Sequence, residues 1–254
     1  MNKINVVDNK IITFDNTDVI LNNNIITFTN NGDYYLEYIT SDNVNITINV
    51  EDNVCVQLFE YSNNNDINTN ITYNLGKNSS LIISKFYYND NTNEEINIYL
   101  NKKNANIKYN FSSISKNHDN YLINIYHNDS TTNSDIFNRT IAKENSSNNF
   151  DINSYVENKI LDCYLNQSTK IITLGDSNNK INPNMFTHDN SVTAIHASVI
   201  GNVNEEELFY LMSRGISYNE AIKIIIKGII LSNINPNMEY REKILNILEE
   251  VGGE

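Results

Sequence analysis

Residues 96–111, INIYLNKKNANIKYNF, contain the pattern that decides the fold. Apolar side chains occupy every second position in residues 96–100 and again in residues 107–111, and a stretch rich in Asn and Lys separates the two runs. Alternation with a period of two predicts β-strands that bury one face. Ile, Tyr and Phe, which fill these runs, are residue types that strands favour.

The same pattern repeats from residue 9 to about residue 195, for example in residues 44–50 and 54–58. The runs recur about every ten residues, a spacing typical of all-β sandwiches, barrels and solenoids. Clusters of Asn, Asp, Ser and Gly separate them, and these residue types tolerate tight and left-handed turns. No helix of three turns can be fitted before residue 200, so we expect a mainly β chain.

Three all-β architectures compete for this pattern. A sandwich or barrel needs hairpin signals, and Asn31-Gly32 is the clearest of the few that the chain contains. A β-solenoid tolerates corners rich in Asn, because stacked Asn side chains share hydrogen bonds from turn to turn. The pattern therefore favours a solenoid and leaves the other two architectures open.

The apolar period changes after residue 203, where helices replace strands. Asn204 with Glu207 predicts a helix start, and Gly215 predicts its end. Ser217 with Glu220 is a second capping box, followed by an apolar stripe through about residue 231. Pro236 breaks the chain, and a third helix is expected over about residues 238–250.

These features predict two parts, a β core over residues 1–200 and a helical subdomain over residues 201–254. The helical residues expected to pack on apolar surface are Leu208, Leu211, Met212, Ile222, Ile225, Ile226, Ile229, Ile244, Leu245 and Leu248.

Charge and composition exclude several classes of protein. The net charge is -13 with a pI of about 4.7, which argues against nucleic acid and anionic membranes as partners. Cys55 and Cys163 form no metal-binding spacing. The N-terminus lacks the apolar core of a signal peptide, and no run approaches the ~20 apolar residues of a membrane span. We therefore expect a cytoplasmic protein.

A long motif near the C-terminus carries a resemblance to a known family. Residues 207–221, ELFYLMSRGISYNEA, follow residues 183–186, PNMF, and the spaced residues Val192, His196 and Gly201. In this order they resemble the SufB/SufD family of iron–sulfur cluster assembly proteins. A weaker match extends upstream through Phe150, Gln167 and Ile171-Ile172.

The resemblance implies a right-handed parallel β-helix followed by a C-terminal helical subdomain. It also implies docking of the ATPase SufC on the helices, and pairing of the β-helix with a SufB-like subunit or a second copy. The residues expected to dock the ATPase are Leu208, Phe209, Tyr210, Arg214 and Gly215. Full-length members carry a helical N-terminal region, and here strands begin almost at once, so the chain is expected to be a shortened member.

Four positions bear on cluster chemistry. His196 matches the family histidine at the end of the β-helix near the partner subunit, where imidazole can bind iron or shuttle protons. The alternative is a histidine hydrogen-bonded under the helices. Ser168 and Ala197 replace a cysteine and a glutamate of SufB-like members, which indicates a SufD-like chain. Cys163 is either a displaced thiolate ligand or a small buried residue.

The remaining histidines suggest no metal site. His118, His127 and His188 each have an aspartate as neighbour, but adjacent strand residues point to opposite faces, so solvated turns are expected. No Walker A loop, GxSxG or HExxH motif is present, so we expect no enzyme activity. Any iron–sulfur cluster would be held transiently, with no stably bound cofactor.

Two rival functions stay open at this point. One is a stand-alone β-solenoid that binds ligands or has a structural role. Its groove would be lined by Tyr34, Tyr35, Tyr38, Tyr87 and Tyr88. The other is a degenerate paralogue that binds a SufC-like ATPase and takes no part in cluster chemistry.

Overall fold

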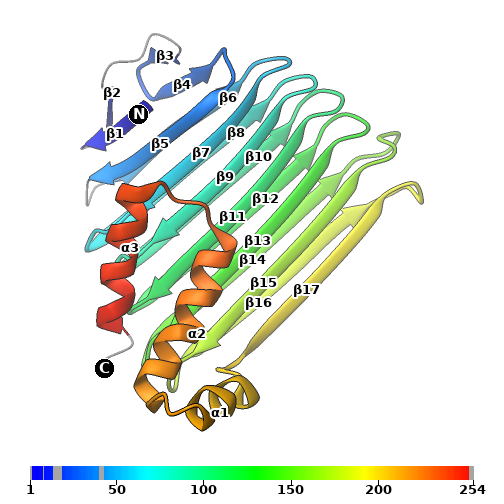
Figure 1. The fold of residues 1–254 in the computed structure, drawn as a ribbon. Coiled ribbons are helices and arrows are strands. Elements are labelled where there is room, and N and C mark those ends of the chain that lie inside the picture. The colour runs from blue at the N-terminus through cyan, green and yellow to red at the C-terminus, as the bar shows by residue number, and fades with distance from the viewer. Residues whose placement is uncertain (1, 8, 14–18, 40–42, 252–254) are drawn as a thin grey trace.

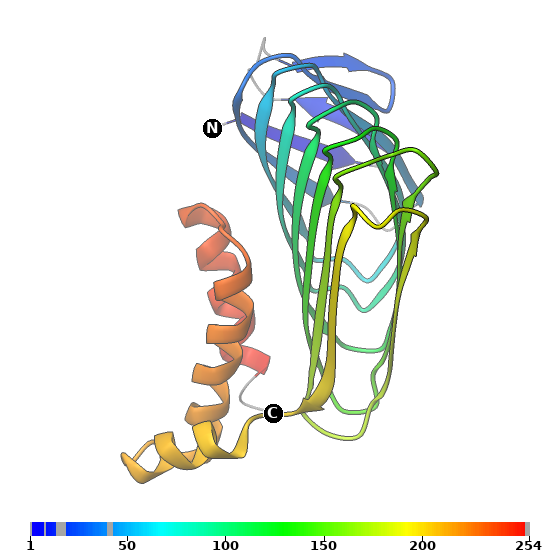
Figure 2. The ribbon, with the colours of Figure 1, turned by 90° about the vertical axis from the view of Figure 1, so that its right-hand side faces the viewer.

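A parallel β-solenoid followed by three helices forms residues 2–7, 9–13, 19–39 and 43–251, the part of the chain that the computed structural model describes (Figure 1). The solenoid makes about six turns and has two long sheets. Figure 2 shows these sheets as the opposite faces of a flattened coil, with the helices outside one face. The solenoid favoured by the sequence is confirmed, and the sandwich and the barrel are excluded.

The chain moves from one sheet to the other with each strand from β4 onward. The first sheet has the order β17-β15-β13-β11-β9-β7-β5-β1-β2, and its strands are β1 (Asn2–Val7), β2 (Lys10–Thr13), β5 (Gly32–Ile39), β7 (Cys55–Ser62), β9 (Ser80–Tyr87), β11 (Asn106–Ser115), β13 (Asn133–Ala142), β15 (Tyr164–Thr173) and β17 (Thr193–Asn202). The second sheet has the order β16-β14-β12-β10-β8-β6-β4-β3, and its strands are β3 (Val19–Asn22), β4 (Ile25–Phe28), β6 (Asn43–Val50), β8 (Asp66–Leu75), β10 (Asn91–Leu100), β12 (His118–His127), β14 (Ser147–Val156) and β16 (Asn178–Thr187).

Each turn pairs in register with the turn before it, so like residues stack. Ile71, Ile96, Ile123 and Ile152 are successive register partners in four neighbouring strands, and all four are fully buried. The alternation read from the sequence therefore becomes columns of apolar side chains between the sheets. Burial of such columns is the main favourable contribution to folding.

Stacked asparagines build one corner of the solenoid. Asn53, Asn78 and Asn104 all have positive φ, at 64°, 53° and 60°, and Thr131 follows at 60°. The Asn78 amide donates to Asn53 Oδ1, and the Asn104 amide donates to Asn78 Oδ1, each at 2.9 Å. Asn tolerates this backbone conformation better than other side chains, and the stack satisfies its polar atoms. The predicted role of Asn-rich corners is confirmed.

The N-terminal end differs from the rest of the coil. Strands β1 and β2 form one antiparallel pair, and β3 and β4 form another with Asn23 in its turn. The hairpin signal at Asn31-Gly32 is misleading, because β4 and β5, which flank it, lie in different sheets. Short antiparallel strands thus end both sheets at this end of the solenoid.

Three helices follow the last strand, α1 (Glu205–Ser213), α2 (Tyr218–Asn233) and α3 (Met238–Val251). Asn204 caps α1, and Ser217 with Glu220 forms the predicted capping box of α2. Gly215 follows α1 with φ of 87°, a conformation that favours glycine. In the described part of the chain, no helix is long and apolar enough to cross a membrane.

Helices α2 and α3 pack on the outer face of the first sheet. Ile226, Ile230 and Ile244 lie in one apolar cluster with outward residues of the sheet such as Phe86 and Ile141. Two predicted core positions are wrong, because Met212 is 44% exposed and Leu245 is only half-buried. Ile247 is buried in place of Leu245, since it continues the stripe that faces the sheet.

A charged cluster lies inside the solenoid, where the apolar pattern predicts none. Lys85 Nζ lies 2.6 Å from Glu94 Oε1 and 3.4 Å from Glu60 Oε2, and all three side chains are buried. Tyr38 and Tyr73 donate hydrogen bonds to Glu60, and Tyr87 and Thr69 donate to Glu94. Charges this deep require partners, because the interior screens them poorly.

Replacing Lys85 by Met is expected to lower the free energy of unfolding by about 3–5 kcal/mol, because both carboxylates lose their buried cation. Urea denaturation measures the change. Lys102→Met is the control, since Lys102 pairs with Asp52 at 3.0 Å on the surface. It should shift the urea midpoint far less. Equal shifts for the two variants would contradict the structural role of the buried cluster.

Candidate functional site

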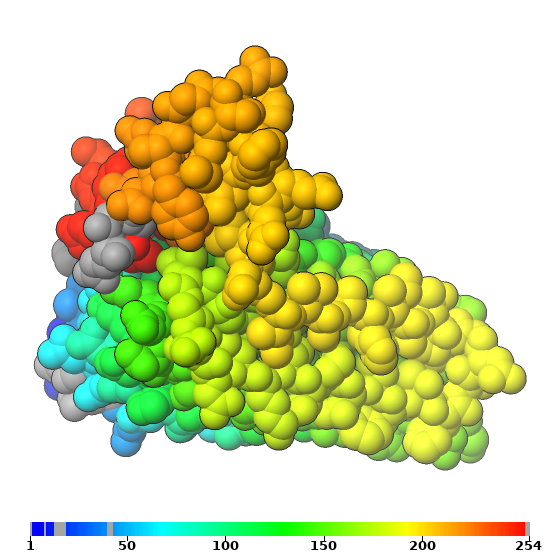
Figure 3. Space-filling view, turned by 90° about the horizontal axis from the view of Figure 1, so that it is seen from below, coloured from blue at the N-terminus to red at the C-terminus, as the bar shows by residue number. Residues whose placement is uncertain are grey.

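The last turn of the solenoid is uncovered. Strand β17 pairs with β15 and β16 pairs with β14, and within the described ranges no strand pairs with their outer edges. Almost every residue of β17 is exposed, including Ile195, Val199 and Ile200. Figure 3 shows this turn in yellow, opposite the blue first turn and beside α1 and α2. An edge of this length with unpaired backbone groups is a surface on which another strand can add.

His196 lies on the inward side of this open turn. Its register partner in β15 is Gln167, whose side chain points into the solenoid and is buried. Gln167 donates to Ser154 Oγ at 2.8 Å and to the Asn184 carbonyl at 3.2 Å, and its own Oε1 has no partner among the described residues. His196 thus faces the open end of the coil, above a buried polar group, and no helix covers it.

Ser168 and Ala197 lie on the opposite side of the same sheet. They are register partners, one residue after Gln167 and His196, and therefore point outward. Arg139 holds Ser168 through bonds from its guanidinium to Ser168 Oγ at 3.2 Å and to the Ser168 carbonyl at 3.0 Å. The structure brings Ser168 and Ala197 together but separates both from His196 by the thickness of the sheet.

Cys163 lies in a closed corner of the penultimate turn. Its side chain is 2% exposed and packs with Val156 and Leu165, and Thr132 Oγ1 lies 3.3 Å from Sγ. Cys55 is exposed, as its position between inward Val54 and Val56 predicts. The structure therefore favours the second alternative, in which Cys163 is a small buried residue, because its side chain is not accessible to a ligand.

His127 is buried at this corner, so the predicted solvated turn is wrong. Its Nδ1 lies 2.8 Å from Thr132 Oγ1 and its Nε2 lies 3.0 Å from Ser134 Oγ. Burial lowers the pKa of His127 to about 4, which keeps the imidazole neutral at pH 7. The alternation in β12 carries this signal, because His127 lies two positions after the buried Ile125.

The other histidines match the expectation. His118 and His188 are exposed, and the described residues contain no group of three His, Cys, Asp or Glu side chains placed to hold a metal ion. Asp119, beside His118, is an exception to the predicted solvation. It points inward, and burial raises its pKa to about 7.

The described residues form no groove lined by the five tyrosines that the ligand-binding hypothesis requires. Tyr34, Tyr38 and Tyr87 are buried between the sheets, and Tyr35 packs under α3 against Tyr240. The stacked aromatic rings that do reach the surface belong to the second sheet: Tyr99, Tyr126, Tyr155 and Phe186.

A second exposed surface lies on α1 and α2. Helix α1 has no buried residue, and Phe209 is 75% and Tyr210 58% exposed. Arg214 ends the helix and places its guanidinium 5.3 Å from the Tyr210 ring centre. Between the two helices lies a groove of about 610 Å³, here called the α1–α2 groove. Its lining includes Tyr210, Leu211, Ile224, Ile225, Gly228 and Ile229. Apolar surface of this kind is typical of sites that bind another protein.

The fold and these two surfaces define the class of protein: a parallel β-solenoid with an open last turn, followed by three helices of which the first has no buried residue. Residues 12–229 match the model of one family, described as the SUF system FeS cluster assembly, SufBD core domain. The chain belongs to this family.

Curated relatives share parts of the chain. It is 25% identical over 134 residues to the iron–sulfur cluster assembly protein SufD of Bacillus subtilis, a match covering 52% of this chain and 31% of that protein. It is 54% identical over 35 residues to the SufBD family protein PH1385 of Pyrococcus horikoshii, covering 14% of this chain and 8% of that protein. It is 44% identical over 46 residues to the SufBD family protein ycf24 of Galdieria sulphuraria, covering 18% of this chain and 21% of that protein. The matches thus cover less than a third of each relative.

Substituting His127 should change how stability depends on pH. The unfolded imidazole titrates near pH 6.5 and the folded one near 4, so the free energy of unfolding contributed by His127 is present above pH 6.5 and is lost as pH falls toward 4. Asp119 acts in the opposite direction, because its raised folded pKa favours folding at low pH.

The comparison of wild type with His127→Gln by urea denaturation isolates the histidine. Between pH 7 and pH 5 the wild type should lose about 2 kcal/mol more than the variant. A pH-independent difference between the two proteins would show that His127 titrates alike in the folded and unfolded states, as a solvated imidazole does.

Proposed function

We propose that the chain is a SufD-like component of a SufBCD-type complex in iron–sulfur cluster assembly. It would act without catalysing a reaction itself, as a subunit that binds a SufC-like ATPase through α1 and α2. The observation that carries this proposal is the α1 surface: the motif of residues 207–221 begins on α1, a helix with no buried residue, and continues through the turn into the start of α2. Membership of the SufBD family and the partial match to a SufD support it.

The exposed end of α1 gives the docking a physical basis. Phe209, Tyr210 and Met212 present aromatic and sulfur-containing surface to water beside the α1–α2 groove. Burying this surface against another protein is favourable, and aromatic anchors commonly supply most of the binding energy at interfaces. Arg214 and Gly215 contribute by fixing the turn that orients α1 against α2.

The open last turn supplies a surface for a second partner. Strands β16 and β17 end their sheets with free edges within the described residues, and β17 carries exposed Ile195, Val199 and Ile200. We propose that a SufB-like subunit or a second copy of the chain covers this end. Its strands would extend both sheets and bury these side chains.

The positions that bear on cluster chemistry favour the SufD-like role. A nascent cluster needs thiolate ligands. Here Ser168 stands at the expected thiolate position, Ala197 lies beside it, and Cys163 is closed in its corner. His196 is then the residue through which this chain would contact the cluster or its ligands, at the junction with the partner. The cluster is cargo of the complex and would be held transiently.

Docking of the ATPase is tested by co-expression with a SufC-like protein and affinity purification. The wild-type chain should retain the ATPase, and Phe209→Ser should lower the retained fraction about tenfold, because an exposed aromatic anchor is lost. Met238→Ser is the matched control, since Met238 is 89% exposed on α3 and does not belong to the α1 surface. A wild type that retains no ATPase, or equal loss in both variants, would overturn the docking proposal.

Pairing at the open turn is tested separately by sedimentation velocity, alone and with a SufB-like subunit. Ile200→Lys should abolish the paired species, because the lysine would be buried between two solenoid ends. Ile20→Lys is the control at the other end, where Ile20 is 56% exposed. Pairing that survives Ile200→Lys would place the partner elsewhere.

A further inference from the structure

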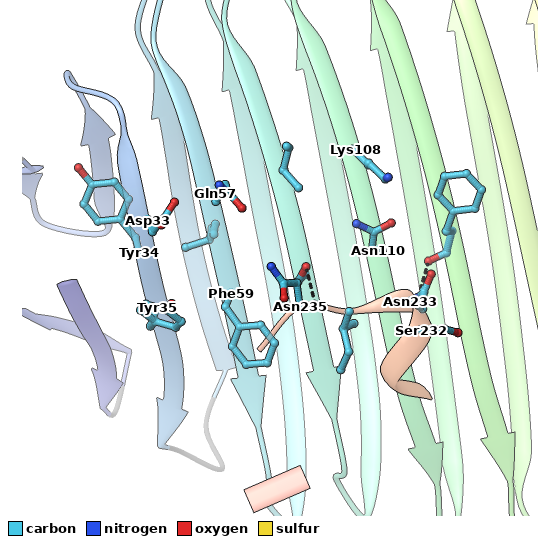
Figure 4. Close-up of a pocket in the computed structure, with 15 residues that line it drawn as sticks. Asp33, Tyr34, Tyr35, Gln57, Phe59, Lys108, Asn110, Ser232, Asn233 and Asn235 are labelled. Carbon is cyan, nitrogen blue, oxygen red and sulfur yellow. Dashed lines mark hydrogen bonds between the residues drawn. The ribbon is translucent and has the colours of Figure 1, made fainter. Parts of the chain in front are cut away.

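A polar cleft crosses the outer face of the first sheet, away from the open turn, and it shares one lining residue, Ser232, with the α1–α2 groove. It lies between strands β5, β7, β9 and β11 and residues 232–235, which are the end of α2 and the start of its connection to α3 (Figure 4). Its volume is about 460 Å³, within the range of small-molecule sites. We call it the 232–235 cleft.

Hydrogen bonds hold the 232–235 segment in place as one wall. The Asn233 amide donates to the Phe111 carbonyl at 2.8 Å and to the Phe137 carbonyl at 3.3 Å. The Asn235 backbone N–H donates to Ser84 Oγ at 3.3 Å, a bond drawn in Figure 4. The opposite wall is a sheet, so both sides of the cleft are fixed before any ligand arrives.

The cleft carries opposite charges at its two ends. Asp33, Gln57, Ile82 and Lys108 are successive register partners on β5, β7, β9 and β11, and all point outward. Three strand spacings therefore separate Asp33 from Lys108, about 14 Å between their Cα atoms. Within the described part of the chain, neither side chain forms an ion pair. Asp135, the next residue in the column after Lys108, accepts a hydrogen bond from Asn166 at 2.9 Å.

Unused amides lie between the two charges. Asn110 is 8% exposed, lines the cleft below Lys108, and has no side-chain hydrogen bond to any residue that the structure describes. Gln57, beside Asp33 in Figure 4, likewise presents a free amide. A primary amide both donates and accepts hydrogen bonds, as a peptide bond does, so these two amides suit a peptide ligand. Phe59, Ile82 and Phe137 supply apolar surface among these groups.

From this arrangement we propose that the 232–235 cleft binds a short zwitterionic peptide of two or three residues. Asp33 receives the terminal ammonium, Lys108 receives the terminal carboxylate, and the amides of Gln57 and Asn110 bond to the peptide groups between them. An extended tripeptide measures about 10 Å, and contacts of about 3 Å at each end bring the span to about 16 Å, against about 14 Å between the two Cα atoms. Lys108 Nζ lies 5.9 Å from the ring centre of Phe137 on β13, so its ammonium extends beyond β11 toward the next strand. Side chains of the peptide rest on Phe59, Ile82 and Phe137.

The test is an NMR titration of the ¹⁵N-labelled full chain with Ala-Ala-Ala. Saturable shifts should appear in residues of β7, β9 and β11 and in residues 232–235. The same peptide with an acetylated N-terminus and an amidated C-terminus should bind at least about tenfold more weakly, because both charge-assisted contacts are lost. Asp33→Asn and Lys108→Gln should each weaken binding of the free peptide about tenfold.

Two matched variants control for a general effect of charge. Glu51→Gln and Lys103→Gln remove the same charges from exposed positions outside the cleft and should leave the affinity unchanged. Three results would each overturn the proposal: no saturable shifts with the free peptide, equal affinity for the blocked peptide, or an affinity that Asp33→Asn and Lys108→Gln leave unchanged.

Discussion

In-register pairing between successive turns is the constraint on which this structure depends. Each strand hydrogen-bonds to the strand one turn earlier, so every side chain lies on a like-facing neighbour. The corners must close without breaking that register, and left-handed Asn53, Asn78 and Asn104 do so while bonding to one another. The apolar columns, the buried charges and the flat outer faces all follow from that stacking.

The same stacking turns the outer face of the first sheet into a platform. Rows of outward residues, among them Phe86 and Ile141, pack under α2 and α3, and the joining segment is pinned to the sheet by Asn233. Helix α1 has no such platform, because it lies beyond the last strand. Leu208 and Leu211 are partly buried against the helix–sheet cluster, while Phe209, Tyr210 and Met212 stay exposed.

The last two strands of the first sheet place His196 on one side of that sheet and Ser168 and Ala197 on the other. His196 faces the end of the coil over Gln167, and Ser168 and Ala197 face outward beside Arg139. Strand alternation alone implies this division, because consecutive residues point to opposite faces. A single site containing all three side chains is thereby excluded for the isolated chain.

The sequence by itself determined the alternating strands, the asparagine corners, the caps of α1 and α2, and the family, because each depends on local spacing that any reader of the chain can measure. Only the tertiary structure decided which inward positions are polar. Glu60 and Lys85 are 25 residues apart and pair as register partners in successive turns, and Glu94 reaches Lys85 from the opposite sheet, nine residues later in the chain. The 232–235 cleft has the same origin. Its two charged residues lie on strands three places apart in the sheet. Its second wall is formed by residues more than a hundred positions later in the chain. No local sequence pattern therefore predicts the cleft.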